Sequence, residues 1–186
     1  AELIKAAALA VTLALAAILV YIWFRFEWQF AVGAVMALSH DVITTIGLFA
    51  VTQLEFNLAT VAAILTIAGY SINDTVVIYD RVREELRRYK TMPIPELLNL
   101  AVNRTLSRTF LTSVTTLIAL LALSLLGGPI IRDFSLAMIW GVVIGTYSSI
   151  FVAVPALLFL KLGRDAFSIS DDAEGGSGDD DVEPGA

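Results

Sequence analysis

The sequence predicts an all-α fold in the form of a polytopic bundle of transmembrane helices. Of the 186 residues, 58% are hydrophobic and only 16% are charged, whereas soluble domains average about 45–50% and about 25%. Five apolar runs are long enough to cross a hydrocarbon core about 30 Å thick as helices. Their continuous apolar character favours helices over alternating barrel strands. The five runs are residues 6–24, 30–52, 57–79, 109–127 and 134–160.

Acidic and basic residues are almost absent from these runs. The first, fourth and fifth carry none, the second carries His40 and Asp41, and the third carries Asp74. Because the chain begins without an initiator Met, we expect a fragment whose earlier part is missing. A signal peptide or signal anchor over residues 1–24 is the alternative.

Loop charges predict how the bundle crosses the membrane. Lys5 and Arg132 fall on one side, and the other ten basic residues fall on the opposite side. Cytoplasmic loops carry the excess of Lys and Arg, so we expect the fragment to start outside the membrane and to end in the cytoplasm. The ten residues are Arg25, Arg81, Arg83, Arg87, Arg88, Lys90, Arg104, Arg108, Lys161 and Arg164.

Residues 80–108 predict a cytoplasmic linker made of two helical pieces separated by a Pro-rich break. The second piece, 96–107, places apolar residues on one face, so we expect an amphipathic helix along the membrane surface. It can serve as a structural elbow or as a docking site for a partner. Residues 165–186 are rich in Ser, Gly and Asp and predict a disordered acidic tail, which leaves residues 1–164 as the transmembrane bundle.

Composition excludes several functional classes. The chain has no Cys and a single His, which excludes disulfides and thiol catalysis and argues against a zinc site. The absence of a broad basic face argues against nucleic-acid binding. An intramembrane aspartyl protease could use Asp41 and Asp74, but its GxGD motif is absent, as are GxSxG and Walker motifs. We therefore expect neither an enzyme nor a metal or cofactor site.

Asp74 is the strongest candidate for a functional residue. An ionisable group inside a membrane span costs about 2.5–3.5 kcal/mol, so it indicates function. Asp74 lies six residues, about 9 Å of helix, before Asp80, the first cytoplasmic charge. Ser71 and Thr75 share its helical face. A desolvated carboxyl beside hydroxyls can exist in two protonation states, as a proton carrier requires; a structural hydrogen bond to a neighbouring helix is the alternative.

Further polar residues at comparable depth predict a hydrated pathway around Asp74. Arg108 stands beside a stripe of threonines, and His40 next to Asp41 is either a relay or a simple structural hydrogen bond. Gly141 and Gly145 form a GxxxG pair that predicts close helix packing, and Pro155 is expected to kink or loosen its helix. The supporting pathway residues are His40, Asp41, Ser71, Asn73, Thr75, Thr109 and Thr112.

Two segments resemble a known family. GYSINDTVVIYDRVR over 69–83 and NRTLSRTFLTSVTT over 103–116, together with His40-Asp41, are similar to the SecF-type members of the SecD/SecF family of bacterial protein-export membrane proteins. That family belongs to the resistance–nodulation–division superfamily. The resemblance implies that Asp74 matches the family's proton-carrying aspartate and that Arg108 matches its essential arginine.

The same resemblance implies a location and partners. We expect a multi-pass protein of the bacterial inner membrane that pairs with SecD and acts beside the SecYEG channel, with a YajC-type accessory subunit and membrane lipid around it and preproteins as substrates. It implies an auxiliary subunit of the Sec translocase that uses the proton-motive force, with protons as the coupling ion and no cofactor. A proton-driven small-molecule exporter and a passive structural subunit remain the alternatives.

Overall fold

A computed structural model of the chain describes residues 2–53 and 57–160. Within these residues the chain is helical and has no strand, so the predicted all-α class is confirmed. The predicted tail over 165–186, with Lys161 and Arg164, lies outside the described residues. The elements are α1 (Glu2–Arg25), α2 (Trp28–Thr52), α3 (Leu58–Arg88), α4 (Ile94–Leu126), α5 (Pro129–Ser148), the π-helix η1 (Ser149–Ala153) and α6 (Val154–Phe159).

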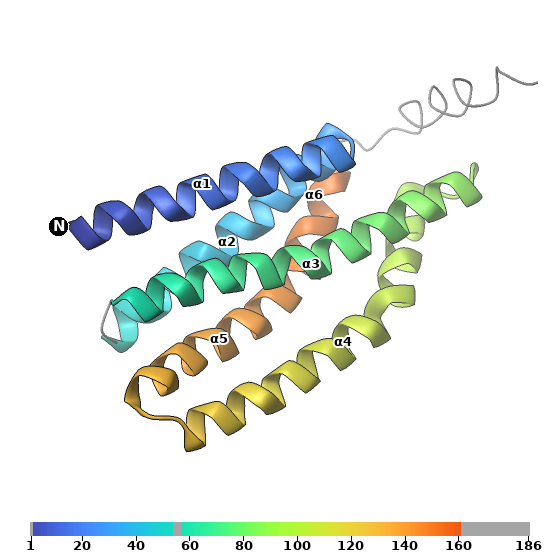
Figure 1. Cartoon of the computed structure of the whole chain (residues 1–186). Coiled ribbons are helices and arrows are strands. Elements are labelled where there is room, and N and C mark those ends of the chain that lie inside the picture. The colour runs from blue at the N-terminus through green and yellow to red at the C-terminus, as the bar shows by residue number, and fades with distance from the viewer. Residues whose placement is uncertain (1, 54–56, 161–186) are drawn as a thin grey trace, which may run out of the picture.

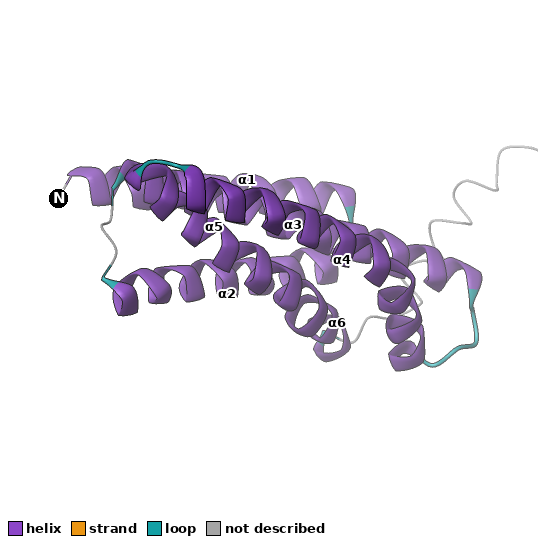
Figure 2. Cartoon of the chain, turned by 90° about the horizontal axis from the view of Figure 1, so that it is seen from below, coloured by secondary structure: helices purple, strands orange, loops and turns teal. Residues whose placement is uncertain are grey.

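Five helices are long and apolar enough to cross a membrane, as the sequence predicts. The fifth consists of α5, η1 and α6 in continuous succession. α3 contacts α1, α2, α4 and α5, and α5 contacts α2, α3 and α4, whereas α1 packs mainly on α2 and α3 (Figure 1). Figure 2 shows α1 and α3 in an upper layer and α2 below them. The chain is thus a multi-pass membrane bundle.

The start of α4 differs from the expectation of a separate surface helix. Instead of a helix over 96–107 followed by a new span, one helix runs from Ile94 to Leu126, and Figure 1 shows its first turns bent away from the rest. Pro95 lies in the first turn, where a proline is tolerated, so it begins the helix without interrupting it. Leu97 and Ala101 are buried in the same cluster as Val82 of α3, so the apolar face of these turns packs on the protein.

The two glycines of the GxxxG pair bring α5 close to α3. A Cβ at Gly141 would collide with Ile67, and one at Gly145 would lie 3.0 Å from the Cβ of Ser71. These two positions therefore have to lack a side chain for the helices to approach this closely.

Pro155 lies directly after the π-helix η1. Proline lacks an N–H, and its ring clashes with the carbonyl four residues earlier, at Phe151. The wider π-helical turn relieves this clash, which is the loosening that the sequence predicts. The Tyr79 hydroxyl donates a hydrogen bond of 3.0 Å to the carbonyl of Ala153, the last residue of η1, and a Cβ at Gly33 would collide with that hydroxyl.

Candidate functional site

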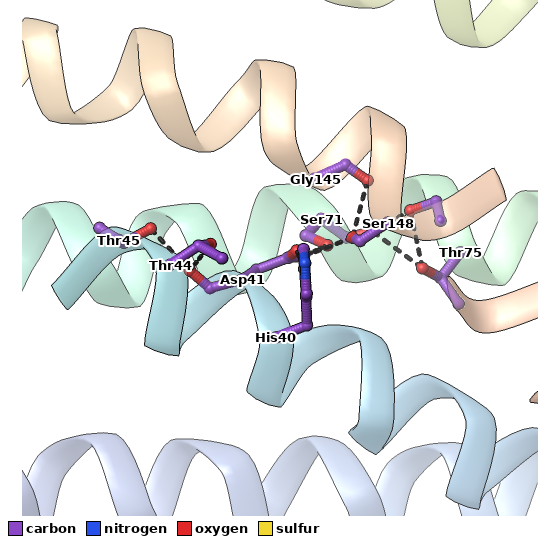
Figure 3. Close-up of polar contacts among 9 residues, drawn as sticks. His40, Asp41, Thr44, Thr45, Ser71, Thr75, Gly145 and Ser148 are labelled. Carbon is purple, nitrogen blue, oxygen red and sulfur yellow. Dashed lines mark hydrogen bonds and ion pairs between the residues drawn. The ribbon is translucent and has the colours of Figure 1, made fainter. Parts of the chain in front are cut away.

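Asp41 lies at the junction of three helices. Its side chain is completely buried on α2. Oδ2 accepts hydrogen bonds from the hydroxyls of Ser71 on α3 and Ser148 on α5, the latter at 2.8 Å. Oδ1 lies 3.1 Å from Nδ1 of His40. Both carboxyl oxygens therefore have partners, and Figure 3 shows these side chains converging on the Asp41 carboxyl.

The hydroxyl contacts continue along α3 toward the π-helix. Thr75 Oγ1 and Ser149 Oγ are 2.9 Å apart, and the Ser149 hydroxyl also donates to the Ser71 carbonyl at 3.4 Å. Thr75, Ser148 and Ser149 are all buried. We call the set Asp41, Ser71, Thr75, Ser148 and Ser149 the Asp41 cluster; it joins α2, α3 and α5.

Asp74 lies on α3 one helical turn after Ser71 and has a different environment. Its residue is 3% exposed, yet its buried Oδ2 has no hydrogen-bond partner in the described part of the chain. Arg108 of α4 is near enough for its charge to act on the Asp74 carboxylate. Among residues 2–53 and 57–160, no ion pair joins the two side chains. Asp74 is therefore a buried carboxyl with unused acceptor capacity beside a fixed positive charge.

Arg108 lines an open pocket between α3 and the first turns of α4. The pocket has a volume of about 510 Å³ and is mostly polar. The Arg108 side chain is exposed at this pocket. The lining residues are Val77, Asp80, Arg81, Glu84, Arg104, Thr105 and Arg108.

A buried acid, Glu85, links α3 to α4 beside this pocket. The Glu85 side chain is fully buried, lies 2.8 Å from Arg81 Nε and pairs with Arg104 of α4. Sequence reasoning missed this group. The spacing of Arg81 and Glu85 by four residues could have indicated half of it, but no local pattern indicates Arg104.

The structure brings together some of the predicted pathway residues and separates others. His40, Asp41, Ser71 and Thr75 gather at the Asp41 cluster. Asn73 is exposed. Thr112 is exposed and its hydroxyl donates to the Arg108 carbonyl of its own helix at 3.1 Å. Thr109 is buried on α4, outside the Asp41 cluster.

Two members of the cluster, Ser148 and Ser149, were absent from the predicted site. They continue the face of Gly141 and Gly145 at helical spacing, and that signal could have found them. A separate hydroxyl pair, Ser113 and Thr146 at 2.7 Å, links α4 to α5 away from Asp41. In the described residues no group of three or more His, Asp or Glu side chains could hold a metal ion.

Comparisons with known proteins agree on one family. The family model described as "Protein export membrane protein SecD/SecF, C-terminal" matches residues 1–163. A protein translocase subunit SecF from Cereibacter sphaeroides is 60% identical over 163 residues, which are 88% of this chain and 50% of the relative. One from Rickettsia bellii is 56% identical over 156 residues, covering 84% and 52%. The chain thus spans about half the length of these curated relatives.

Two solved structures share the fold. The crystal structure of SecDF in the super-membrane-facing form has a TM-score of 0.81 at 46% identity, over 91% of this chain and 23% of that one. That of SecDF from Thermus thermophilus, described as a translocon-associated membrane protein, has a TM-score of 0.83 at 46% identity, over 87% and 22%.

Proposed function

Because the chain belongs to the SecD/SecF family of protein export membrane proteins, we propose that it is the proton-coupling transmembrane part of an auxiliary subunit of the Sec protein translocase. In this proposal it assists the export of preproteins across the bacterial inner membrane and uses the proton-motive force. It is not itself an enzyme. SecD is its partner beside SecYEG, and the excess of Lys and Arg in the connections predicted for one side of the membrane supports a cytoplasmic position for that side.

The observation that carries the proposal is the unpartnered carboxyl oxygen of Asp74. A charged carboxylate without a hydrogen-bond donor is costly inside a membrane, whereas the neutral acid can be accommodated more easily. A nearby cation reverses that preference. Asp74 beside the movable Arg108 therefore has the elements of a group that takes up and releases a proton.

Arg108 contributes a fixed charge to this exchange. Arginine does not lose its proton in proteins, so it cannot carry one. Two unit charges 4 Å apart attract by about 4 kcal/mol at an effective dielectric constant near 20. Approach of Arg108 to Asp74 thus favours the ionised carboxylate and proton release, and withdrawal favours proton uptake. The open pocket around Arg108 gives room for such movement.

The test is proton flux in proteoliposomes that contain the full-length subunit and SecD. Asp74→Asn should insert normally, because the side chains are nearly isosteric, and should abolish proton-dependent export. Glu96→Gln is the control, since Glu96 is an exposed acid in the first turn of α4, outside the pocket that Arg108 lines, and it should retain flux. Native flux in Asp74→Asn would leave a passive structural subunit as the better description. Flux without any effect on preprotein export would favour a small-molecule exporter.

A further inference from the structure

We propose that Asp41 is a positioning residue: its carboxylate holds α3 and α5 in register beside Asp74, and it carries no proton itself. The inference rests on the proposed function, in which Asp74 is the proton carrier, and it gives the buried carboxyl of Asp41 a separate role.

The hydrogen bonds of Asp41 require an acceptor. The hydroxyls of Ser71 and Ser148 both donate to Oδ2. A proton on Oδ2 would turn that oxygen into a donor and displace at least one of the two serine bonds. His40 is the titratable side chain in contact with the carboxyl among the described residues, and α3 and α5 contribute hydroxyls. The cluster therefore requires Oδ2 of Asp41 to remain an acceptor.

The two serines lie where their positions matter for Asp74. Ser71 precedes Asp74 by one helical turn, and its Cβ packs against Gly145 of α5. Ser148 directly precedes the π-helix η1. Because it accepts hydrogen bonds from both hydroxyls, Asp41 fixes the register of α5 relative to α3.

Two further contacts fasten η1 to the same face of α3. Thr75 meets Ser149, the first residue of η1, and Tyr79 donates to the carbonyl of Ala153, the last residue. Ser71, Thr75 and Tyr79 follow one another at a spacing of four residues and so form one stripe of α3. Without the Asp41 acceptor the Ser71 hydroxyl loses its hydrogen bond. Ser71, and Asp74 one turn later on α3, should then shift relative to α5.

Asparagine separates positioning from proton carriage at this site. The amide oxygen of Asp41→Asn can still accept from both serines, and its NH₂ group can face the His40 ring. Asp41→Ala removes the acceptor altogether. A positioning residue should tolerate the first change and fail in the second, whereas a proton carrier should fail in both.

The functional experiment uses the full-length subunit with SecD in proteoliposomes, and proton flux is measured across a range of pH. We expect Asp41→Asn to keep near-native flux and pH profile. Asp41→Ala should lose about tenfold or more in flux, because the buried hydroxyls of Ser71 and Ser148 lose their acceptor. The double variant Ser71→Ala/Ser148→Ala should lose as much, because it removes both hydrogen bonds to Asp41. The pH profile of both variants should change. Ser113→Ala is the matched control, since it removes an interhelical hydroxyl pair that does not involve Asp41.

A second readout reports the register itself and does not depend on proton coupling. The chain has no Cys, so pairs can be introduced without background. The pair Thr75→Cys/Ser149→Cys reports contact between α3 and η1, and Ser113→Cys/Thr146→Cys reports contact between α4 and α5. Asp41→Ala should slow oxidative crosslinking of the first pair and leave the second unchanged. If Asp41→Ala does not accumulate in the membrane, Ser148→Ala gives the same comparison.

Two results would overturn the inference. One is an Asp41→Asn variant that loses flux as completely as Asp74→Asn while its crosslinking rate stays native, because Asp41 would then carry a proton. The other is native flux and native crosslinking in Asp41→Ala or Ser148→Ala. Native flux in Asp74→Asn would instead remove the proposed function, and the crosslinking rates would still decide whether Asp41 sets the register.

Discussion

Asp41 of α2 contacts α3 at Ser71, one helical turn before Asp74, yet the surroundings of these two buried carboxyls differ. Asp41 is completely buried and has a partner for each oxygen. Asp74 is nearly as buried, but its Oδ2 has none in the described residues. Burial alone therefore does not distinguish the two acids, whereas the number of hydrogen-bond donors around each carboxyl does. We propose that this number separates a structural carboxyl from one that can exchange a proton.

The two sides of α3 differ in the same way. On the side of α3 that faces α5, the helices approach closely at Gly141 and Gly145, and the hydroxyls of the Asp41 cluster bond across them. The two helices therefore have little room to move relative to each other. Toward α4, an open polar pocket of about 510 Å³ separates the helices around Arg108. We infer that the α5 side is the fixed frame and that the α4 side is where charges move.

The largest effect should come from removing the moving charge. Arg108→Ala should abolish proton flux and proton-dependent export, because Asp74 then lacks the cation that favours its ionised state. Arg108→Lys keeps the charge and loses the planar fork, so partial activity would indicate a role of charge alone. Export by Arg108→Ala at the native rate, with expression and SecD pairing verified, would remove Arg108 from the mechanism.

A second prediction concerns how much the buried Glu85, which pairs with Arg104 of α4, contributes to stability. Glu85→Ala should lower the free energy of unfolding by about 2–3 kcal/mol, because Arg104 loses a charge-assisted hydrogen bond and Arg81 loses an ion-pair partner. Thermal unfolding of the full-length subunit in detergent measures the change. Glu84→Ala is the control, since Glu84 pairs with Arg81 at an exposed position, and should change stability little. Equal effects of the two variants would show that burial of Glu85 contributes nothing.

A smaller loss of stability should follow from adding a side-chain atom at the close interface between α3 and α5. Gly145→Ala places a Cβ 3.0 Å from the Cβ of Ser71, and overpacking of this kind costs about 1–3 kcal/mol. Gly69→Ala is the control on α3, because nothing lies within 4 Å of its added Cβ. Unfolding midpoints of the two variants give the comparison. If Gly145→Ala is as stable as Gly69→Ala, the α5 side is looser than this account requires.

The smallest effect should come from His40. Its side chain is about one third exposed and contacts Oδ1 of Asp41, which is not the oxygen bound to the serines. His40→Gln should therefore leave proton flux near native and change stability by about 1 kcal/mol or less. A loss of flux comparable to that of Asp74→Asn would make His40 a proton relay.

The sequence could predict the helices because each span is a continuous apolar run, and it could predict Asp41 and Asp74 because an acid inside such a run is rare. It could also predict the Pro-rich break, since α3 ends at Arg88 and α4 begins at Ile94 with Pro95 in its first turn. It could not predict that residues 96–107 and the fourth span form one helix, Ile94–Leu126. The amphipathic pattern of 96–107 ends near Ser107, and nothing in it indicates that the helix continues.

The partners of the two acids were beyond the reach of the sequence. Ser148 lies 107 positions from Asp41 and meets it only through packing of α5 on α2. The spacing from Gly141 and Gly145 puts Ser148 on the packed face of α5, but it does not indicate Asp41 as the partner, and the Ser113 hydroxyl bonds elsewhere. Asn73 and Thr112 were predicted from depth alone, but their direction around the helix turns them outward. The depth of a residue in the membrane can be predicted from the sequence, whereas the direction in which its side chain points depends on tertiary contacts.

In the proposed mechanism Asp74 exchanges a proton and Asp41 does not. Infrared difference spectroscopy after a pH jump distinguishes the two carboxyls, because a protonated carboxyl has its own C=O stretching band. In the full-length subunit with SecD, one such band assigned to this chain should disappear in Asp74→Asn and persist unchanged in Asp41→Asn. A band that persists in Asp74→Asn and disappears in Asp41→Asn would contradict the account.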